Sequence, residues 1–354
     1  MIAVAVLLVV LLAGVTAQGF VSPTESEVPE GKSLENVEYN DGDAYANLYE
    51  EVIDSVVSIR VGTSPANSAQ GSGFVYDFNG HVITNQHVVT DADEVEVRFS
   101  EGDWRRGEVI GTDVYTDLAV IEVEEVPEYA EPMPLADGHP TQGTPVAALG
   151  NPLGLEGSIT QGIVSGVNRS MRTESDFSIP DTVQTDAGID RGNSGGPLVT
   201  LNGEVVGVNR ARQGNTIGFA VSAALVERVV PDLIHTGSTE HAYMGVRTVD
   251  VSPSVADAND LEEPRGVLVA ETAQGGPSEG VFVESEEVES NGFPMQVGGD
   301  VIVGVEGTSI GSHEELSRYL MLHTEPGQTV DVTVIRDGDR ETVQVTLGSR
   351  PDPT

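Results

Sequence analysis

Short runs in which apolar and polar residues alternate follow one another from residue 55 onward. Apolar residues at every second position are typical of half-buried strands, and the Gly, Asn and Asp residues between the runs favour turns. The clearest runs cover residues 56–61, 73–76, 95–99, 118–123, 146–149 and 205–208. Many short strands in succession predict a β-barrel or a β-sandwich.

Three stretches have helical periodicity instead. Tyr45, Leu48, Tyr49 and Val52 recur at the i, i+3, i+4, i+7 spacing and predict a short amphipathic helix before the first strands. Two more helices are expected at residues 223–235 and 312–322. The first of these closes the strand-rich part of the chain, and a polar linker follows it at residues 236–241.

A second domain is expected from residue 242. Its strand-like runs cover residues 266–269, 301–305, 329–335 and 341–347, and the helix at 312–322 lies among them. The last two runs flank Asp337-Gly338-Asp339, which is a strong hairpin signal.

The N-terminus has a different character. Residues 2–15 are almost purely apolar, and the small residues of Val15-Thr16-Ala17 resemble a signal-peptidase site. Residues 2–20 carry no charge, and a stretch of that length could also be a membrane anchor. For residues 1–20, a signal peptide and an anchor are therefore both open. Residues 21–43 have the composition of a disordered acidic linker. With either interpretation, the domains are expected to be extracytoplasmic, secreted or anchored at the cell surface.

The charge of the chain is strongly negative. It has 57 acidic against 17 basic residues, a net charge of −40, and no cysteine. At about 1 M salt the Debye length is only about 3 Å, so such a surface is tolerable in a halophilic protein. The charge argues against nucleic-acid binding. The absence of cysteine excludes disulfides and thiolate chemistry, and we expect neither a metal nor a cofactor.

Three separated segments hold the residue types that nucleophilic catalysis requires. His87 lies in the segment 83–89, Asp117 precedes the run at 118–123, and Ser194 lies in Gly-Asn-Ser-Gly-Gly. A serine hydroxyl needs a histidine as general base and an aspartate that orients the histidine. The order His, Asp, Ser along the chain is that of the chymotrypsin class. We therefore predict a triad of His87, Asp117 and Ser194.

The glycines around Ser194 have a separate purpose. They allow the tight turn that lets backbone N–H groups converge on one point as an oxyanion hole. The candidate donors are the N–H groups of Gly192, Asn193 and Ser194. An esterase would need a Gly-x-Ser-x-Gly elbow between a strand and a helix, whereas this run leads into strand-like residues at 198–201.

These segments resemble the HtrA (DegP-like) serine proteases, over residues 44–350. The matching segments are 84–89, 116–120, 148–155, 184–187, 191–198 and 217–221. The resemblance implies a mainly β fold: a trypsin-like double six-stranded β-barrel over 44–236 and one α+β PDZ domain over 242–350. It also implies a homotrimer that takes unfolded or misfolded polypeptides and protein C-termini. The acidic composition resembles the haloarchaeal branch.

The resemblance assigns further residues to sites. The residues assigned to substrate binding are Ile189, Arg210, Ala211, Arg212 and Gln213. The resemblance also assigns the PDZ loop that binds a peptide carboxylate to Tyr243, Met244, Gly245 and Val246. The alternative is that these residues are only the start of a strand. Arg169, in a loop expected at 168–181, takes the place of a regulatory residue; the alternative is an ordinary surface arginine.

Two functions follow as expectations. The first is an ATP-independent serine endopeptidase, regulated by its PDZ domain, that degrades misfolded extracytoplasmic proteins. The second is a chaperone or holdase that binds unfolded polypeptides with limited cleavage. The intact His, Asp and Ser set favours the endopeptidase, and the two activities are compatible.

Overall fold

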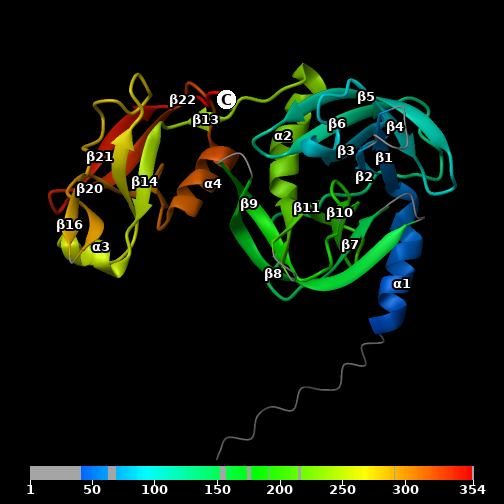
Figure 1. Cartoon of the computed structure of the whole chain (residues 1–354), viewed down its shortest axis with the longest axis horizontal. Helices are drawn as coiled ribbons and strands as arrows, with labels where there is room; N and C mark the ends of the chain where they lie inside the picture. Colours follow the sequence, from blue (N-terminus) through cyan, green and yellow to red (C-terminus); the bar gives the residue numbers. More distant parts are fainter. Residues whose placement is uncertain are drawn as a thin grey trace, which may run out of the picture. The chain divides into compact units, whose positions relative to one another are not determined.

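The computed structural model shown in Figure 1 describes residues 41–62, 69–151, 157–173, 177–190, 192–213, 217–290 and 292–352. The segment expected to be a signal peptide or anchor, at 1–20, lies outside these residues, as does most of the linker expected at 21–43. Among the described residues, none of the helices is both long and apolar enough to cross a bilayer.

Six strands form the first barrel. Helix α1 (Asp41–Val52) and a 3₁₀ turn, η1 (Ile53–Ser55), lead into it. Its strands are β1 (Val56–Val61), β2 (Ala69–Val75), β3 (His81–Asn85), β4 (Glu94–Arg98), β5 (Trp104–Asp113) and β6 (Leu118–Val123). They close in the order β1-β2-β3-β6-β5-β4, and every pairing is antiparallel. The β-branched residues that alternate along these strands fill the barrel interior.

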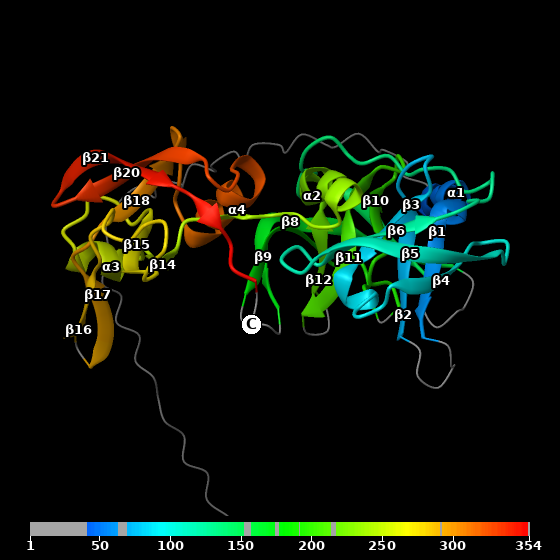
Figure 2. The ribbon, with the colours of Figure 1, turned by 90° about the horizontal axis from the view of Figure 1, so that it is seen from above.

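Six more strands form a second closed barrel. They are β7 (Pro145–Gly150), β8 (Ser158–Arg172), β9 (Ser178–Thr185), β10 (Pro197–Thr200), β11 (Val205–Gln213) and β12 (Ile217–Ser222). Their order is β10-β11-β12-β9-β8-β7, and Figure 2 shows the two barrels side by side. The predicted pair of six-stranded barrels is confirmed.

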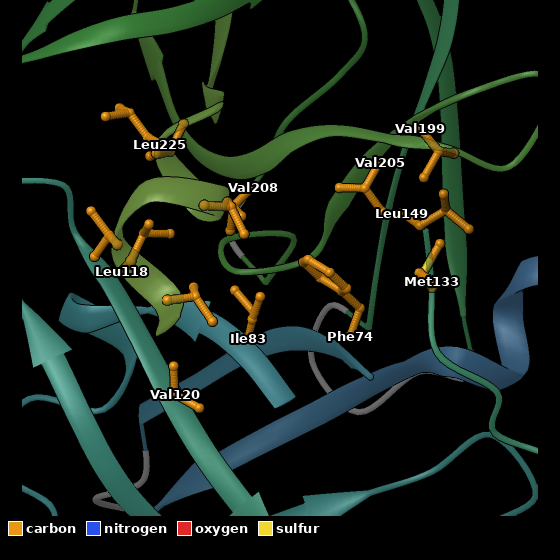
Figure 3. Close-up of a cluster of buried hydrophobic side chains, with 14 of the residues drawn as sticks. Phe74, Ile83, Leu118, Val120, Met133, Leu149, Val199, Val205, Val208 and Leu225 are labelled. Atoms are coloured by element: carbon orange, nitrogen blue, oxygen red, sulfur yellow. The ribbon is translucent and has the colours of Figure 1, made fainter. Parts of the chain in front are cut away.

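One hydrophobic cluster joins the two barrels. Phe74, Ile83 and Leu118 come from the first barrel and point toward Leu149 and Val208 of the second, as Figure 3 shows. All five side chains are fully buried. A close-packed core of this kind resists displacement, so it holds the strands of one barrel in a fixed position against those of the other.

Helix α2 (Ala223–Thr236) follows the second barrel but packs on β5 and β6 of the first. Ser222 caps its N-terminus by accepting a hydrogen bond from the Leu225 N–H, and Gly237, at φ 79°, ends it. A Cβ at Gly111 of β5 would lie 2.5 Å from the carbonyl oxygen of Leu233, so a glycine is needed for this close contact.

The second domain has its own sheet and core. Its sheet contains β14 (Val246–Asp250), β15 (Val267–Thr272), β18 (Val301–Val305), β20 (Thr329–Arg336) and β21 (Asp339–Thr346) in that order, and β19 (Thr308–Ser309) pairs with β18. Helices α3 (Pro253–Ala258) and α4 (His313–His323) accompany it. The short strands β13 (Ala242–Tyr243) and β22 (Gly348–Ser349) pair with each other, so the two ends of this domain meet. The predicted α+β domain is confirmed.

Several elements differ from the expectations. The loop expected at 168–181 is largely a hairpin of β8 and β9, and Arg169 lies within β8. Three register shifts and the left-handed Asn168, at φ 55°, break the regular alternation of apolar residues there, and this hides the strands in the sequence. β5 and the hairpin of β16 (Glu286–Ser290) and β17 (Phe293–Val297) were likewise not predicted.

Candidate active site and peptide groove

His87 and Asp117 come together because their strands are paired. His87 lies in a 3₁₀ turn, η2 (Gln86–Val88), directly after β3, and Asp117 lies directly before β6, where Asn85 is opposite Leu118. The His87 Nδ1 atom is 2.7 Å from Asp117 Oδ2, and the His87 backbone N–H donates to Asp117 Oδ1 at 2.9 Å. The Asp117 side chain is 4% exposed and that of His87 is 42% exposed. A buried carboxylate thus orients a ring that solvent and substrate can reach.

The turn before β6 holds Asp117 in an unusual backbone conformation. Asp117 has φ 58°, in the left-handed region, and its carbonyl oxygen accepts hydrogen bonds from the Gln86 N–H and the Asn85 side-chain amide. Asp113, at the other end of the turn, accepts hydrogen bonds from the Thr116 N–H and hydroxyl. These bonds offset the strain of the left-handed residue and fix the direction of its side chain.

Ser194 lies on the second barrel but is held by the first. Its carbonyl oxygen accepts a hydrogen bond from the Ser72 N–H of β2 at 2.8 Å. The next residue, Gly195, has φ 84°, and a Cβ there would lie 2.2 Å from the Ser72 carbonyl oxygen. Only glycine fits between the barrels at this point. The Ser194 hydroxyl donates to the carbonyl oxygen of Arg210 at 3.1 Å.

The backbone beside Ser194 presents two free donors. Gly192 has φ 104°, and its carbonyl oxygen accepts a hydrogen bond from the Ser72 hydroxyl at 2.6 Å. Among the described residues, the N–H groups of Gly192 and Ser194 have no acceptor. The Asn193 N–H, also an expected donor, instead binds the carbonyl oxygen of Asp190 at 3.0 Å. The arrangement therefore offers two N–H groups to an oxyanion.

A groove in the second domain runs between β14 and α4. The residues expected to catch a carboxylate are among those that line it: Tyr243, the buried Met244, Gly245 at φ 73°, and Val246. Other lining residues are Thr248, His313, Leu316 and Leu320. The carbonyl oxygens of Met244 and Gly245 accept internal hydrogen bonds, whereas their N–H groups bind no acceptor in the described part of the chain. Two free N–H groups in a groove of this kind suit a peptide carboxylate.

Two family profiles match the chain in the places that this geometry indicates. A trypsin-like peptidase domain matches residues 71–208, and a PDZ domain matches residues 242–347. The chain is 35% identical over 297 residues to a probable periplasmic serine endoprotease, DegP-like, from Halomonas elongata, and 36% identical over 301 residues to that of Hahella chejuensis. Each alignment covers 82% of this chain and 59% of the relative.

The chain belongs to the HtrA/DegP-like serine proteases. It spans 59% of the length of those two relatives. Solved HtrA structures agree in fold. The HtrA-type protease AlgW with a decapeptide is 26% identical with a TM-score of 0.67 and covers 87% of this chain and 99% of its own. A serine endoprotease from Yersinia pestis is 28% identical with a TM-score of 0.62 and covers 87% and 98%.

One contact in this candidate active site had no signal in the sequence. The Arg210 guanidinium, expected at the substrate-binding strand, donates through Nε to Asp117 Oδ2 at 2.7 Å. Its Nη1 is 3.9 Å from the sulfur of Met171 in β8, and the side chain is 18% exposed. Arg210 and Asp117 are 93 positions apart, so only the closure of both barrels brings them together.

The other expected site residues have the following places. Ile189 is buried against Gly218 of β12, where a Cβ would lie 2.8 Å from its side chain. Ala211, Arg212 and Gln213 continue β11 and pair with β12. Arg169 is exposed, and its carbonyl oxygen accepts a hydrogen bond from the Thr182 hydroxyl. The described residues contain no cluster of three His, Asp or Glu that could hold a metal ion.

Proposed function

We propose that this chain is an ATP-independent serine endopeptidase that degrades misfolded or unfolded proteins outside the cytoplasm. The observation that carries the proposal is the arrangement around Arg210. Its carbonyl oxygen binds the Ser194 hydroxyl while its side chain binds Asp117, which in turn holds His87. Nucleophile, base and orienting carboxylate therefore lie within one network of contacts where the two barrels meet.

The chemistry follows the serine protease template. The Ser194 hydroxyl turns from the Arg210 carbonyl toward the free ring nitrogen of His87, which takes its proton as Oγ bonds to the substrate carbonyl carbon. The N–H groups of Gly192 and Ser194 stabilise the oxyanion. The C–N bond then breaks, His87 gives its proton to the leaving amine, and water releases the acyl group by the same steps.

The PDZ domain is proposed to bind the C-termini of unfolded polypeptides and to regulate cleavage. Supporting this are the free N–H groups of Met244 and Gly245 and the solved structures of AlgW with peptides. An extended peptide in the groove would add a strand beside β14. The exposed Arg169 is proposed to relay this occupancy through the β8–β9 hairpin.

The setting of the protein is also a proposal. The relatives are named periplasmic endoproteases, which supports a location outside the cytoplasm. The apolar residues 2–15 would serve export or anchoring, and a homotrimer is expected for the family. The net charge of −40 supports function at high salt.

Casein cleavage at about 2 M KCl tests the peptidase proposal, since such salt screens surface charges beyond a few ångströms. Ser194→Ala should reduce the rate to background, because loss of the nucleophile costs about 10⁶ in a serine protease. Ser58→Ala, which removes from β1 a hydroxyl without a hydrogen bond among the described residues, is the matched control and should cleave like the wild type. Equal cleavage by wild type and Ser194→Ala would refute the proposal.

The same variant distinguishes the peptidase from the holdase alternative. The PDZ groove favours the holdase as a second function, because its free N–H groups can bind a polypeptide without the triad. If Ser194→Ala still suppresses the aggregation of a denatured substrate, binding and cleavage are separate activities of one chain. If Ser194→Ala neither cleaves the substrate nor suppresses its aggregation, the chain by itself is not a holdase.

A further inference from the structure

We propose that Arg210 is a positioning residue of the triad, whose charge offsets that of Asp117 and so favours the neutral, proton-accepting form of His87. This inference rests on the proposed peptidase activity. It goes beyond the expected role of Arg210 in substrate binding, because the side chain points away from the substrate strand to the carboxylate behind the histidine.

The geometry places two donors on one oxygen atom. Asp117 Oδ2 lies 2.7 Å from His87 Nδ1 and 2.7 Å from Arg210 Nε. The other oxygen accepts the His87 backbone N–H. A carboxylate with three donors is held firmly in direction. Arg210 therefore keeps Asp117 in the position from which it orients the ring.

The surroundings make the charge of Arg210 effective. Asp117 is 4% exposed and Arg210 is 18% exposed, and the buried Met171 covers the guanidinium on the side of β8. Charges in such surroundings are screened little by salt. In the described part of the chain, Asp117 forms ion pairs with His87 and Arg210 and with no other side chain.

The composition of the chain explains why a cation is useful here. Asp117 stabilises a protonated imidazolium, and this acidic chain has few basic side chains that could oppose that effect. A protonated His87 cannot accept the proton of Ser194. A fixed cation on Asp117 opposes it. Of only 17 basic residues in the chain, one is placed at this carboxylate.

The test is the pH dependence of labelling by a fluorophosphonate. Its phosphorus bonds to Ser194 Oγ, the P–F bond breaks, fluoride leaves, and His87 accepts the hydroxyl proton. The labelling rate rises with pH as His87 becomes the neutral base. Labelling does not depend on pairing of a peptide with β11, so it reports the triad itself.

Arg210→Gln keeps an N–H donor but removes the charge. We expect the rising limb of its labelling rate to move to higher pH by about one unit, the scale on which a neighbouring charge moves a titration. Arg210→Lys restores the charge and should return the limb toward that of the wild type. Arg106→Gln is the matched control: it removes one arginine from the exposed face of β5, and its limb should not move.

The pH dependence of labelling distinguishes the proposed role of Arg210 from the alternatives. If the Arg210→Gln limb stays in place or moves to lower pH, the inference is wrong. If the rate falls equally at every pH, Arg210 holds the carboxylate in place but its charge does not act on His87, and the inference about the charge is wrong. Failure of the wild type to be labelled would refute the proposed peptidase instead. Should Arg210→Gln not fold, Arg210→Thr, a shorter neutral residue, takes its place.

Discussion

Replacing Ser72 with alanine tests how the first barrel holds the nucleophile loop of the second. The Ser72 hydroxyl donates to the carbonyl oxygen of Gly192 at 2.6 Å and accepts the Asn151 N–H at 2.8 Å. Ser72 is fully buried. The substitution removes both bonds and leaves two backbone groups without a partner.

The magnitude follows from these two groups. A buried polar group left without a partner costs about 1–3 kcal/mol, so we expect Ser72→Ala to lower the free energy of unfolding by about 2–4 kcal/mol. For a domain of this size that corresponds to a fall in melting temperature of about 5–10 °C. Because Gly192 is then free to turn, its N–H also leaves the oxyanion hole part of the time. We expect kcat to fall about tenfold to a hundredfold while KM changes little.

The assay compares melting temperature, kcat and KM for peptide cleavage at about 2 M KCl, where surface charges are screened. Ser58→Ala is the control, because Ser58 is paired with Ser72 across β1 and β2 and its side chain forms no hydrogen bond among the described residues. If Ser72→Ala melts and cleaves like Ser58→Ala, the hydroxyl does not hold the Gly192 peptide and the reasoning is wrong.

Two further predictions concern pH and salt. Burial by itself would raise the pKa of Asp77, but hydrogen bonds from His81 and Asn79 outweigh this effect and lower that pKa. The ionised Asp77 therefore stabilises the fold above pH about 4. This stabilisation is lost as the pH falls through the lowered pKa. Asp77→Asn should therefore melt lower than the wild type near pH 7, with the difference shrinking below pH about 4; a constant difference in calorimetry at both pH values would contradict this. The net charge of −40 predicts that the melting temperature of the wild type falls as KCl is lowered from about 2 M to about 10 mM, where the Debye length reaches about 30 Å; a melting temperature independent of KCl would contradict the halophilic interpretation.

Much of the fold could be predicted because local pattern and final structure agree. The strands β1, β6 and β18 and the helix α2 begin at the residues expected from alternation or helical periodicity. Strands that are buried on one face carry this period in their own residues. The long irregular strand β8 does not, because its three register shifts change which residues face inward.

The sequence by itself determined the chemical groups of the candidate site. His87, Asp117 and Ser194 were identifiable from residue type, local motif and order along the chain. The place of Arg210 was not, because its contact with Asp117 depends on how β11 of one barrel lies against the turn before β6 of the other. Such a contact is set by the packing of the shared core, and no local pattern records it. The tertiary structure alone therefore decided that an arginine shares the carboxylate that orients His87.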